Sequence, residues 1–429
     1  MVSSVAMTAT DVHRTIDALW RIESARLIAA LARVMRDVGL AEELAQDALV
    51  IALEQWPRSG VPDNPGAWLM ATAKNRAIDQ LRRQRMRSRK HETLAHELEM
   101  QQQSDGGTLE ARAEDAIGDD LLRLMFIACH PLLSTEARTA LTLKLLAGLT
   151  TAEIARAFLV PEATIAQRIV RAKRTLSDAR VPFEMPRREE LGERLGSVLE
   201  VIYLVFNEGY SATAGEDWVR PALCEEALRL GRILAELAPH EPEVHGLVAL
   251  MEMQASRLRA RTGTEGEPIL LMDQNRSLWD RLLIHRGLLA LARGETLGET
   301  RGPYLLQAAI AACHARALTP ADTDWVYITA LYDELARLAP SPVVELNRAV
   351  AVAMAYGPAA GLELADRLAE HGSLRSYHLL PSVRGDLLAK LGRYAEARGE
   401  FERAAALTQN ARESRLLLAR AAACPQGES

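Results

Sequence analysis

The sequence predicts an all-α protein built from several small helical units. Its 429 residues are 48% hydrophobic but only 4% aromatic, and Ala, Leu, Arg and Glu dominate the composition. These residues favour helices, whereas the β-branched and aromatic residues that favour strands are few. Apolar side chains recur at three- and four-residue intervals, and Pro or Gly interrupts that pattern often enough to delimit short helices.

Length and motif content exclude several classes of protein. A chain of this length exceeds one ordinary core, so we expect two to four domains. None of the four cysteines forms a CxxC pair, which argues against a structural zinc site and a disulfide framework. We read no signal peptide and no membrane span, and therefore expect a cytoplasmic protein. Phosphate-binding loops and hydrolase motifs are missing from the sequence, so we expect no enzyme, no metal and no cofactor.

Three helices are expected at the N-terminus. Gly39 is placed at the C-terminal stop of the first helix, and Pro57 ends the second. Asn64 followed by proline is typical of an N-cap with Pro at the first helical position, which starts the third helix. The predicted helices span residues 13–37, 41–56 and 64–85.

Charge is distributed in blocks that the overall net charge of −6 conceals. Residues 74–90 hold eight basic residues and one acidic residue, and residues 121–182 hold nine basic and four acidic residues. Between them, residues 91–120 hold nine acidic residues and one basic residue. A single charged run is usually a solvated helix face. Two basic blocks on helical patterns favour two nucleic-acid contacts separated by an acidic linker.

The second basic block contains a helix-turn-helix pattern in residues 149–176. A short helix over 151–158 is followed by a turn and a longer helix from Glu162. Apolar residues of the longer helix form the packing stripe: Ile165, Ile169, Ala172 and Leu176. The remaining face is suited to base edges and phosphates, and comprises Thr164, Gln167, Arg168 and Arg171 with Lys173 and Arg174 beside it. An αα-hairpin with a charged face remains the alternative.

The first basic block lies on the expected third helix. Its polar and basic side chains are candidates for contacts with single-stranded DNA: Lys74, Asn75, Arg76, Asp79, Arg82 and Arg83. Trp68 lies two turns before Asn75 and offers an aromatic platform for an unstacked base. The alternative interpretation of the Trp68 ring is a core residue.

Residues 13–182 resemble an extracytoplasmic-function (ECF) sigma factor of bacterial RNA polymerase. The resemblance rests on the segments 40–56, 64–83 and 141–176, in this order and spacing. It implies binding to the polymerase core through a region 2 helix, reading of a −10 promoter element by residues 64–83, and reading of a −35 element by the helix-turn-helix. The side chains implied in polymerase binding are Glu42, Glu43, Gln46 and Asp47. The family often has Gly in the helix-turn-helix turn, where this chain has Leu159.

The rest of the chain resembles the tetratricopeptide-like extension of one ECF subgroup. The segment 387–407 matches the turn and second helix of such a repeat, although an irregular helical array describes the whole extension better. We expect residues 197–206 to form a buried helix. The resemblance implies that the extension regulates or supports activity, with a small DGPF/YCII-like protein or peptide as its expected partner. The predicted domains are region 2 at 9–90, an acidic linker at 91–119, region 4 at 120–182 and the extension at 183–429.

The main alternative function is a one-component helix-turn-helix transcription regulator with a ligand- or partner-sensing helical domain. Such a regulator needs only one DNA-binding module and binds promoter DNA without the polymerase core. A sigma factor uses two modules and depends on the core.

Overall fold

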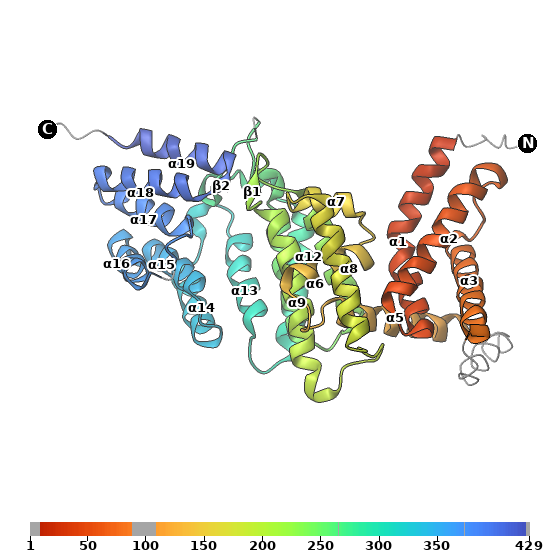
Figure 1. Ribbon diagram of the computed structural model, residues 1–429. Coiled ribbons are helices and arrows are strands. Elements are labelled where there is room, and N and C mark those ends of the chain that lie inside the picture. Colours follow the sequence, from red (N-terminus) through yellow and green to blue (C-terminus); the bar gives the residue numbers. More distant parts are fainter. Residues whose placement is uncertain (1–8, 88–108, 265, 373, 426–429) are drawn as a thin grey trace, which may run out of the picture. The chain divides into compact units, whose positions relative to one another are not determined.

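The computed structural model describes residues 9–87, 109–264, 266–372 and 374–425, and these residues are mainly helical with almost no strand (Figure 1). The chain divides into two compact units, residues 1–201 and residues 202–429. The division falls inside helix α9, which runs from Arg188 to Tyr210. The prediction of an all-α fold is therefore confirmed.

The first unit begins with three mutually packed helices: α1 (Ala9–Met35), α2 (Val38–Ser59) and α3 (Pro65–Arg87). The prediction that Gly39 ends the first helix is wrong. The α1 helix ends at Met35, Arg36 adopts a positive φ of 53°, and Asp37 caps α2 by accepting a hydrogen bond from the Leu40 amide at 2.9 Å. Gly39 lies in the first turn of α2 because this side-chain cap allows the new helix to begin before the glycine.

The second helix also runs past its predicted end, because Pro57 lies inside the last turn of α2. Proline is tolerated there, and the helix closes at Gly60, whose amide donates to the Trp56 carbonyl at 3.0 Å. The start of α3 agrees with the prediction: the Asn64 side chain accepts a hydrogen bond from the Ala67 amide at 3.0 Å.

The first unit continues with helices that pack on α1 and on one another. They are α5 (Leu109–Ala128), α6 (Thr135–Leu145), α7 (Thr151–Ala157) and α8 (Glu162–Asp178). Helix α5 begins at Leu109, within the predicted linker 91–119. Most of the predicted acidic linker, residues 91–108, lies outside the described residues.

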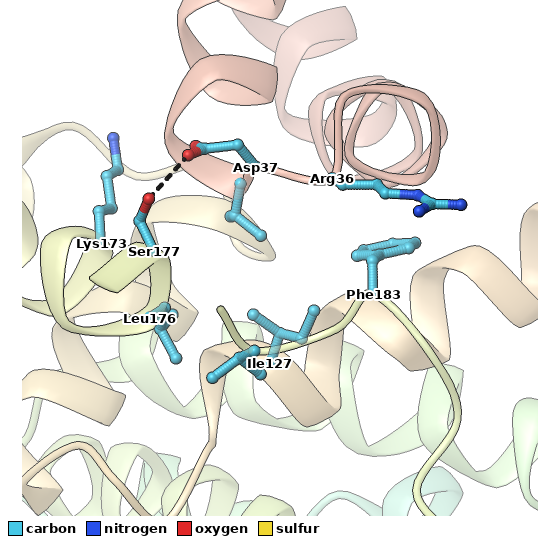
Figure 2. A pocket seen from close by; sticks show the side chains of 9 residues that line it. Arg36, Asp37, Ile127, Lys173, Leu176, Ser177 and Phe183 are labelled. Atoms are coloured by element: carbon cyan, nitrogen blue, oxygen red, sulfur yellow. Dashed lines mark hydrogen bonds between the residues drawn. The ribbon is translucent and has the colours of Figure 1, made fainter. Parts of the chain in front are cut away.

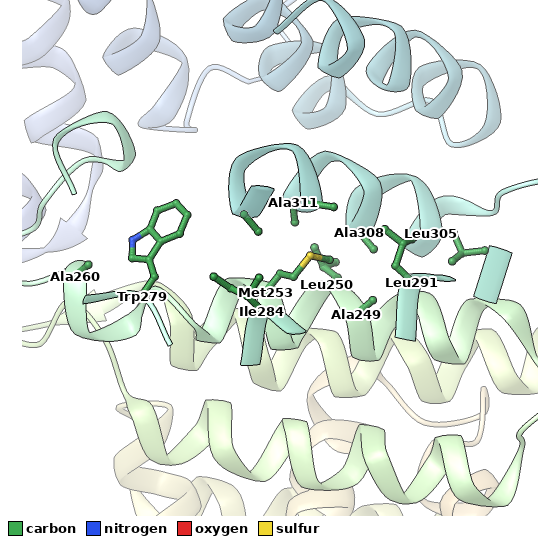
Figure 3. Packing of buried hydrophobic residues seen from close by; sticks show 12 residues of the cluster. Ala249, Leu250, Met253, Ala260, Trp279, Ile284, Leu291, Leu305, Ala308 and Ala311 are labelled. Atoms are coloured by element: carbon green, nitrogen blue, oxygen red, sulfur yellow. The ribbon is translucent and has the colours of Figure 1, made fainter. Parts of the chain in front are cut away.

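The second unit is a chain of helices in which successive members pack against each other. After α9 they are α10 (Pro221–Leu237), α11 (Pro242–Ala255), α12 (Arg281–Leu297), α13 (Pro303–Arg316), α14 (Trp325–Leu338), α15 (Pro342–Tyr356), α16 (Pro358–His371), α17 (Leu379–Lys390), α18 (Tyr394–Leu407) and α19 (Ala411–Ala423). Figure 3 shows the apolar cluster between α11, α12 and α13. Residues 197–206 form part of α9, and the expected helix is confirmed.

One contact joins the beginning and the end of this second unit. The two-residue strands β1 (Ala214–Gly215) and β2 (Gln409–Asn410) pair in parallel. The Asn410 side chain, which is buried, donates hydrogen bonds to the carbonyls of Ala212 at 3.1 Å and Asp217 at 2.8 Å. Because the paired segments are almost 200 residues apart, no local sequence pattern indicates this closure.

Candidate nucleic-acid interface

Helix α3 presents a continuous polar face to solvent. Its buried side chains, Leu69, Ala73 and Ala77, face α1 and α2. On the exposed side lie five of the residues predicted to contact single-stranded DNA: Lys74, Asn75, Arg76, Asp79 and Arg82. Arg83 belongs to α3, but its side chain lies outside what the structure describes. One helix thus brings together hydrogen-bonding groups and cations over about two turns.

Trp68 is half-buried, so its ring is only partly a core residue. It packs edge-on against the buried Trp56 ring of α2, with ring centroids 5.3 Å apart and planes inclined by 66°. The contact fixes the orientation of the Trp68 ring on the α3 surface. Part of the Trp68 ring therefore packs as a core residue, and the other part is accessible as a stacking surface.

An ion pair connects the predicted polymerase-binding helix to the predicted −10 helix. The Arg76 Nη1 atom of α3 lies 2.9 Å from the Asp47 Oδ2 atom of α2, and about half of each side chain is exposed. Glu43 is exposed on α2, and Gln46 donates a hydrogen bond of 2.8 Å to Glu42. The ion pair therefore links the exposed surface of α2 directly to that of α3.

Glu42 departs from the expectation that it lies on the polar face of α2. Its side chain is only 4% exposed and lies between two lysines of the helix-turn-helix half of the unit. The Lys144 Nζ atom of α6 lies 3.7 Å from one carboxylate oxygen, and Lys173 of α8 forms an ion pair with the other. Sequence periodicity could not detect this burial, because it depends on packing between helices more than 100 residues apart.

Helices α7 and α8 form the predicted helix-turn-helix geometry. Thr150 and Glu153 make a reciprocal capping box at the start of α7. At its end, Leu159 adopts φ 51° and donates to the Arg156 carbonyl at 3.4 Å, while Val160 donates to the Ala155 carbonyl at 3.1 Å. This pair of bonds is the Schellman arrangement, with a leucine in the left-handed position that usually holds glycine. The apolar stripe of α8 is buried as expected.

The outward face of α8 carries most of the residues predicted to contact the duplex. Gln167, Arg171 and Arg174 are exposed, and Thr164 and Arg168 are half-buried beside them. Lys173 does not join this group: successive helical positions differ by about 100° around the axis, and its ammonium group faces Glu42 of α2. The prediction that Lys173 lies beside the exposed cations of α8 is therefore wrong.

Two further contacts join the halves of the first unit. The Arg21 guanidinium of α1 pairs with Glu153 of α7 at 2.7 Å. Ser177 of α8 donates a hydrogen bond of 3.1 Å to Asp37, as shown in Figure 2. Asp37 and Ser177 line a small pocket whose apolar lining includes Phe183. Sequence analysis missed these contacts because each partner lies on a different amphipathic helix.

Among the described residues, no group of three or more His, Cys, Asp or Glu side chains is arranged to hold a metal ion. No described helix is long and apolar enough to cross a membrane.

Burial raises the pKa of the Cys129 thiol to about 11 and that of Cys224 to about 12, so both remain protonated near neutral pH.

Comparisons with known protein families agree with this geometry. Residues 19–87 match the Sigma-70 region 2 family, residues 123–176 match the Sigma-70 region 4 family, and residues 194–295 match a family of unknown function (DUF6596). The two sigma matches contain the exposed faces of α3 and α8, respectively. The third match covers the start of the second unit.

Two relatives extend the comparison. An uncharacterized protein of Rhizobium meliloti (strain 1021) is 47% identical over 386 residues, which cover 90% of each chain. The ECF RNA polymerase sigma factor SigK of Mycobacterium ulcerans (strain Agy99) is 31% identical over 160 residues, covering 35% of this chain and 78% of that protein. No solved structure matches the chain significantly. The chain belongs to the ECF family of RNA polymerase sigma factors, with a helical C-terminal extension.

Proposed function

We propose that this sigma factor reads two promoter elements, with α3 at the −10 element and α8 at the −35 element. The supporting observation is the presence of two separate exposed polar faces, each on a helix matched by a different sigma-70 region. Gln167 and Arg168 on α8 have the hydrogen-bonding groups that read base edges in the major groove. The exposed Arg171 and Arg174 are suited to neighbouring phosphates.

The role of α3 in this proposal is to hold bases extruded from the melted −10 element. Asn75 and Asp79 supply hydrogen-bonding groups, the cations track phosphates, and the Trp68 ring supplies a stacking surface. Melting costs roughly 1.4 kcal/mol of stacking per base-pair step, which base capture and polymerase contacts must offset. The protein itself breaks no covalent bond in this scheme.

Reconstituted transcription tests the proposal against a one-component regulator. Core polymerase with this protein should initiate at a specific promoter, whereas a one-component regulator binds its promoter without core. Arg168→Ala should weaken recognition by about 1–3 kcal/mol, and the loss should depend on the base at one −35 position. The matched control is Arg174→Ala, whose effect should be nearly the same for all −35 sequences. Absence of core binding would favour the regulator.

Binding of the core by α2 is the second part of the proposal. Glu43, Gln46 and Asp47 are accessible or partly accessible on α2, but Glu42 is paired with Lys173. We infer that core binding through Glu42 requires this ion pair to open. The Glu42 carboxylate is only 4% exposed, and a buried carboxylate that loses its partner is destabilised by more than the roughly 1 kcal/mol typical of exposed pairs, which itself corresponds to about fivefold in affinity.

Removing the lysine therefore tests whether the contact is inhibitory. Lys173→Gln should increase the affinity for core polymerase by at least about fivefold, measured by titrating labelled protein with core. Arg174→Gln is the matched control, because Arg174 is the next residue and pairs only locally with Asp178 at 3.3 Å. Unchanged or weaker core binding by Lys173→Gln would contradict the inhibitory contact.

For the C-terminal extension we propose a regulatory or supporting role exercised through protein contacts. Helical arrays of this kind present extended surfaces to peptides and partner proteins. A small DGPF/YCII-like protein or peptide remains the proposed partner. Co-purification of such a protein with the full chain, and its effect on initiation by the reconstituted holoenzyme, would test this role; no effect on initiation would contradict it.

A further inference from the structure

Three arginines gather around two aromatic rings in the second unit, and we call Arg257, Arg261 and Arg276 the arginine cluster. The Arg257 Cζ atom lies 5.7 Å from the centroid of the Tyr210 ring and 5.9 Å from that of the Trp279 ring. Arg261 lies 3.7 Å from Tyr210, and Arg276 lies 4.8 Å from Trp279. Each ring is therefore shared by two guanidinium groups, with Arg257 in the middle. Figure 3 shows Trp279 at one end of the apolar cluster, beside Ala260.

Two members of the cluster have evident structural partners. Arg276 donates hydrogen bonds to the carbonyls of His314 at 2.9 Å and Ala317 at 2.6 Å, which satisfies the C-terminal end of α13. Arg261 donates to the Tyr210 carbonyl at 3.0 Å, at the end of α9. These bonds hold both guanidinium groups in place, yet they involve neutral carbonyls and neutralise no charge.

Arg257 has no such partner. The residue is only 8% exposed, and among the described residues its guanidinium has no carboxylate within ion-pairing distance. Its buried Nε atom is unsatisfied, and the Nε atoms of Arg261 and Arg276 are unsatisfied as well. A buried donor left unsatisfied costs about 1–3 kcal/mol, and a bound water or ion is one way to satisfy it.

Among the described residues, neighbouring acidic groups do not neutralise the positive charge of the arginine cluster. None of the three arginines forms an ion pair among the described residues, although Asp322 lies near enough to Arg276 to influence it electrostatically. Burial, with Arg257 and Arg276 adding to it, lowers the pKa of His314 to about 3, so this neighbour is neutral. The result is an excess of hydrogen-bond donors and positive charge enclosed by aromatic rings.

We propose that the arginine cluster is a binding site for a small oxyanion of the phosphate or carboxylate type, and that Arg257 is its principal ligand-binding residue. A guanidinium presents its donors in a planar fork that matches two oxygens of a phosphate or carboxylate. Tyr210 and Trp279 hold the guanidinium planes by cation–π contacts, so little side-chain freedom remains to be lost on binding. The inference concerns the second unit and does not depend on promoter recognition.

Thermal unfolding of the full-length protein tests the site directly. Sodium phosphate and sodium acetate are each compared with sodium chloride at equal ionic strength. At least one oxyanion should raise the unfolding midpoint of the natural protein by several degrees over chloride, because a ligand that binds only the folded state stabilises it. A response to phosphate alone identifies a phosphoryl ligand, and a response to acetate alone identifies a carboxylate.

Variants separate a ligand-binding arginine from a structural one. Arg257→Gln should abolish the response to the oxyanion while leaving the protein at least as stable in chloride, because the substitution removes a buried unsatisfied Nε donor and one of three clustered positive charges. Arg259→Gln is the matched control, since Arg259 is exposed and lies two residues away. It should keep the full response.

A second variant keeps the test decisive if Arg257→Gln fails to fold. Arg257→Lys retains the charge but loses the fork, so calorimetric titration with the effective anion should show at least tenfold weaker binding than in the natural protein. The proposal is overturned if neither anion shifts the midpoint of the natural protein relative to chloride. It is equally overturned if the Arg257 variants bind the anion as tightly as the natural protein does.

Discussion

Leu159 offers a sharp test of how the helix-turn-helix turn is built. A left-handed conformation costs an L-amino acid about 1–2 kcal/mol relative to glycine, which lacks a Cβ atom. Glycine in turn loses about 0.5–1 kcal/mol to backbone entropy relative to alanine. At φ 51° the first effect should exceed the second, so Leu159→Gly should be more stable than Leu159→Ala by about 1 kcal/mol. At ordinary positions the order is reversed.

Comparing the Gly variant with the Ala variant largely cancels the loss of the Leu159 side-chain contacts. The Leu159 side chain is 52% exposed, so truncation loses some apolar contact, but both variants lose it equally. Hydrogen exchange of the amides of α7 and α8 in the full-length protein measures local opening. We expect roughly fivefold slower exchange in Leu159→Gly than in Leu159→Ala.

Two control positions accompany this experiment. Ala163→Gly, at an exposed position of α8, should accelerate exchange, because glycine there has no strain to relieve. Arg180, with φ 50° in the same arrangement at the end of α8, should behave like Leu159. Equal or faster exchange in Leu159→Gly than in Leu159→Ala would refute the strain argument.

Two further predictions concern titratable groups. Because burial raises the pKa values of Cys129 and Cys224, both thiols should be alkylated at pH 8 at least about 100-fold more slowly in the native protein than in denaturant, as measured by mass spectrometry; rapid native labelling would contradict this. Because His314 is buried in its neutral form, the free energy of unfolding should fall in acid. Its folded-state pKa of about 3 lies below the usual 6.5, so the unfolded state takes up a proton first and stability falls as the pH drops from about 6.5 toward 3, by at most about 1.4 kcal/mol per pH unit. His314→Phe should flatten the pH dependence of urea midpoints over this range, and an unchanged dependence would show that His314 is not responsible.

Local sequence patterns predicted most of the helices and both candidate faces. The apolar stripe of α8 leaves Gln167 and Arg171 on the opposite side of the helix, and that assignment needs only the 3.6-residue period. The Asn64 N-cap is equally local, since its acceptor and donor are three residues apart. The left-handed turn at Leu159 was not predicted, because a leucine disfavours positive φ and its presence suggested a reshaped turn, whereas the structure keeps Leu159 at φ 51°.

Features that depend on which helices meet were decided only by the tertiary structure. Glu42 belongs to the polar residues of α2 by sequence, yet packing of α2 near α8 buries it and directs Lys173 toward it. The pairing of β1 with β2 and the arginine cluster likewise join segments far apart in the chain. Periodicity reports the environment on one side of one helix, whereas burial of a charge depends on the partner that covers it. The sequence by itself thus determined the helices and their exposed faces, and only the tertiary structure decided which charges are covered, paired or left without a partner.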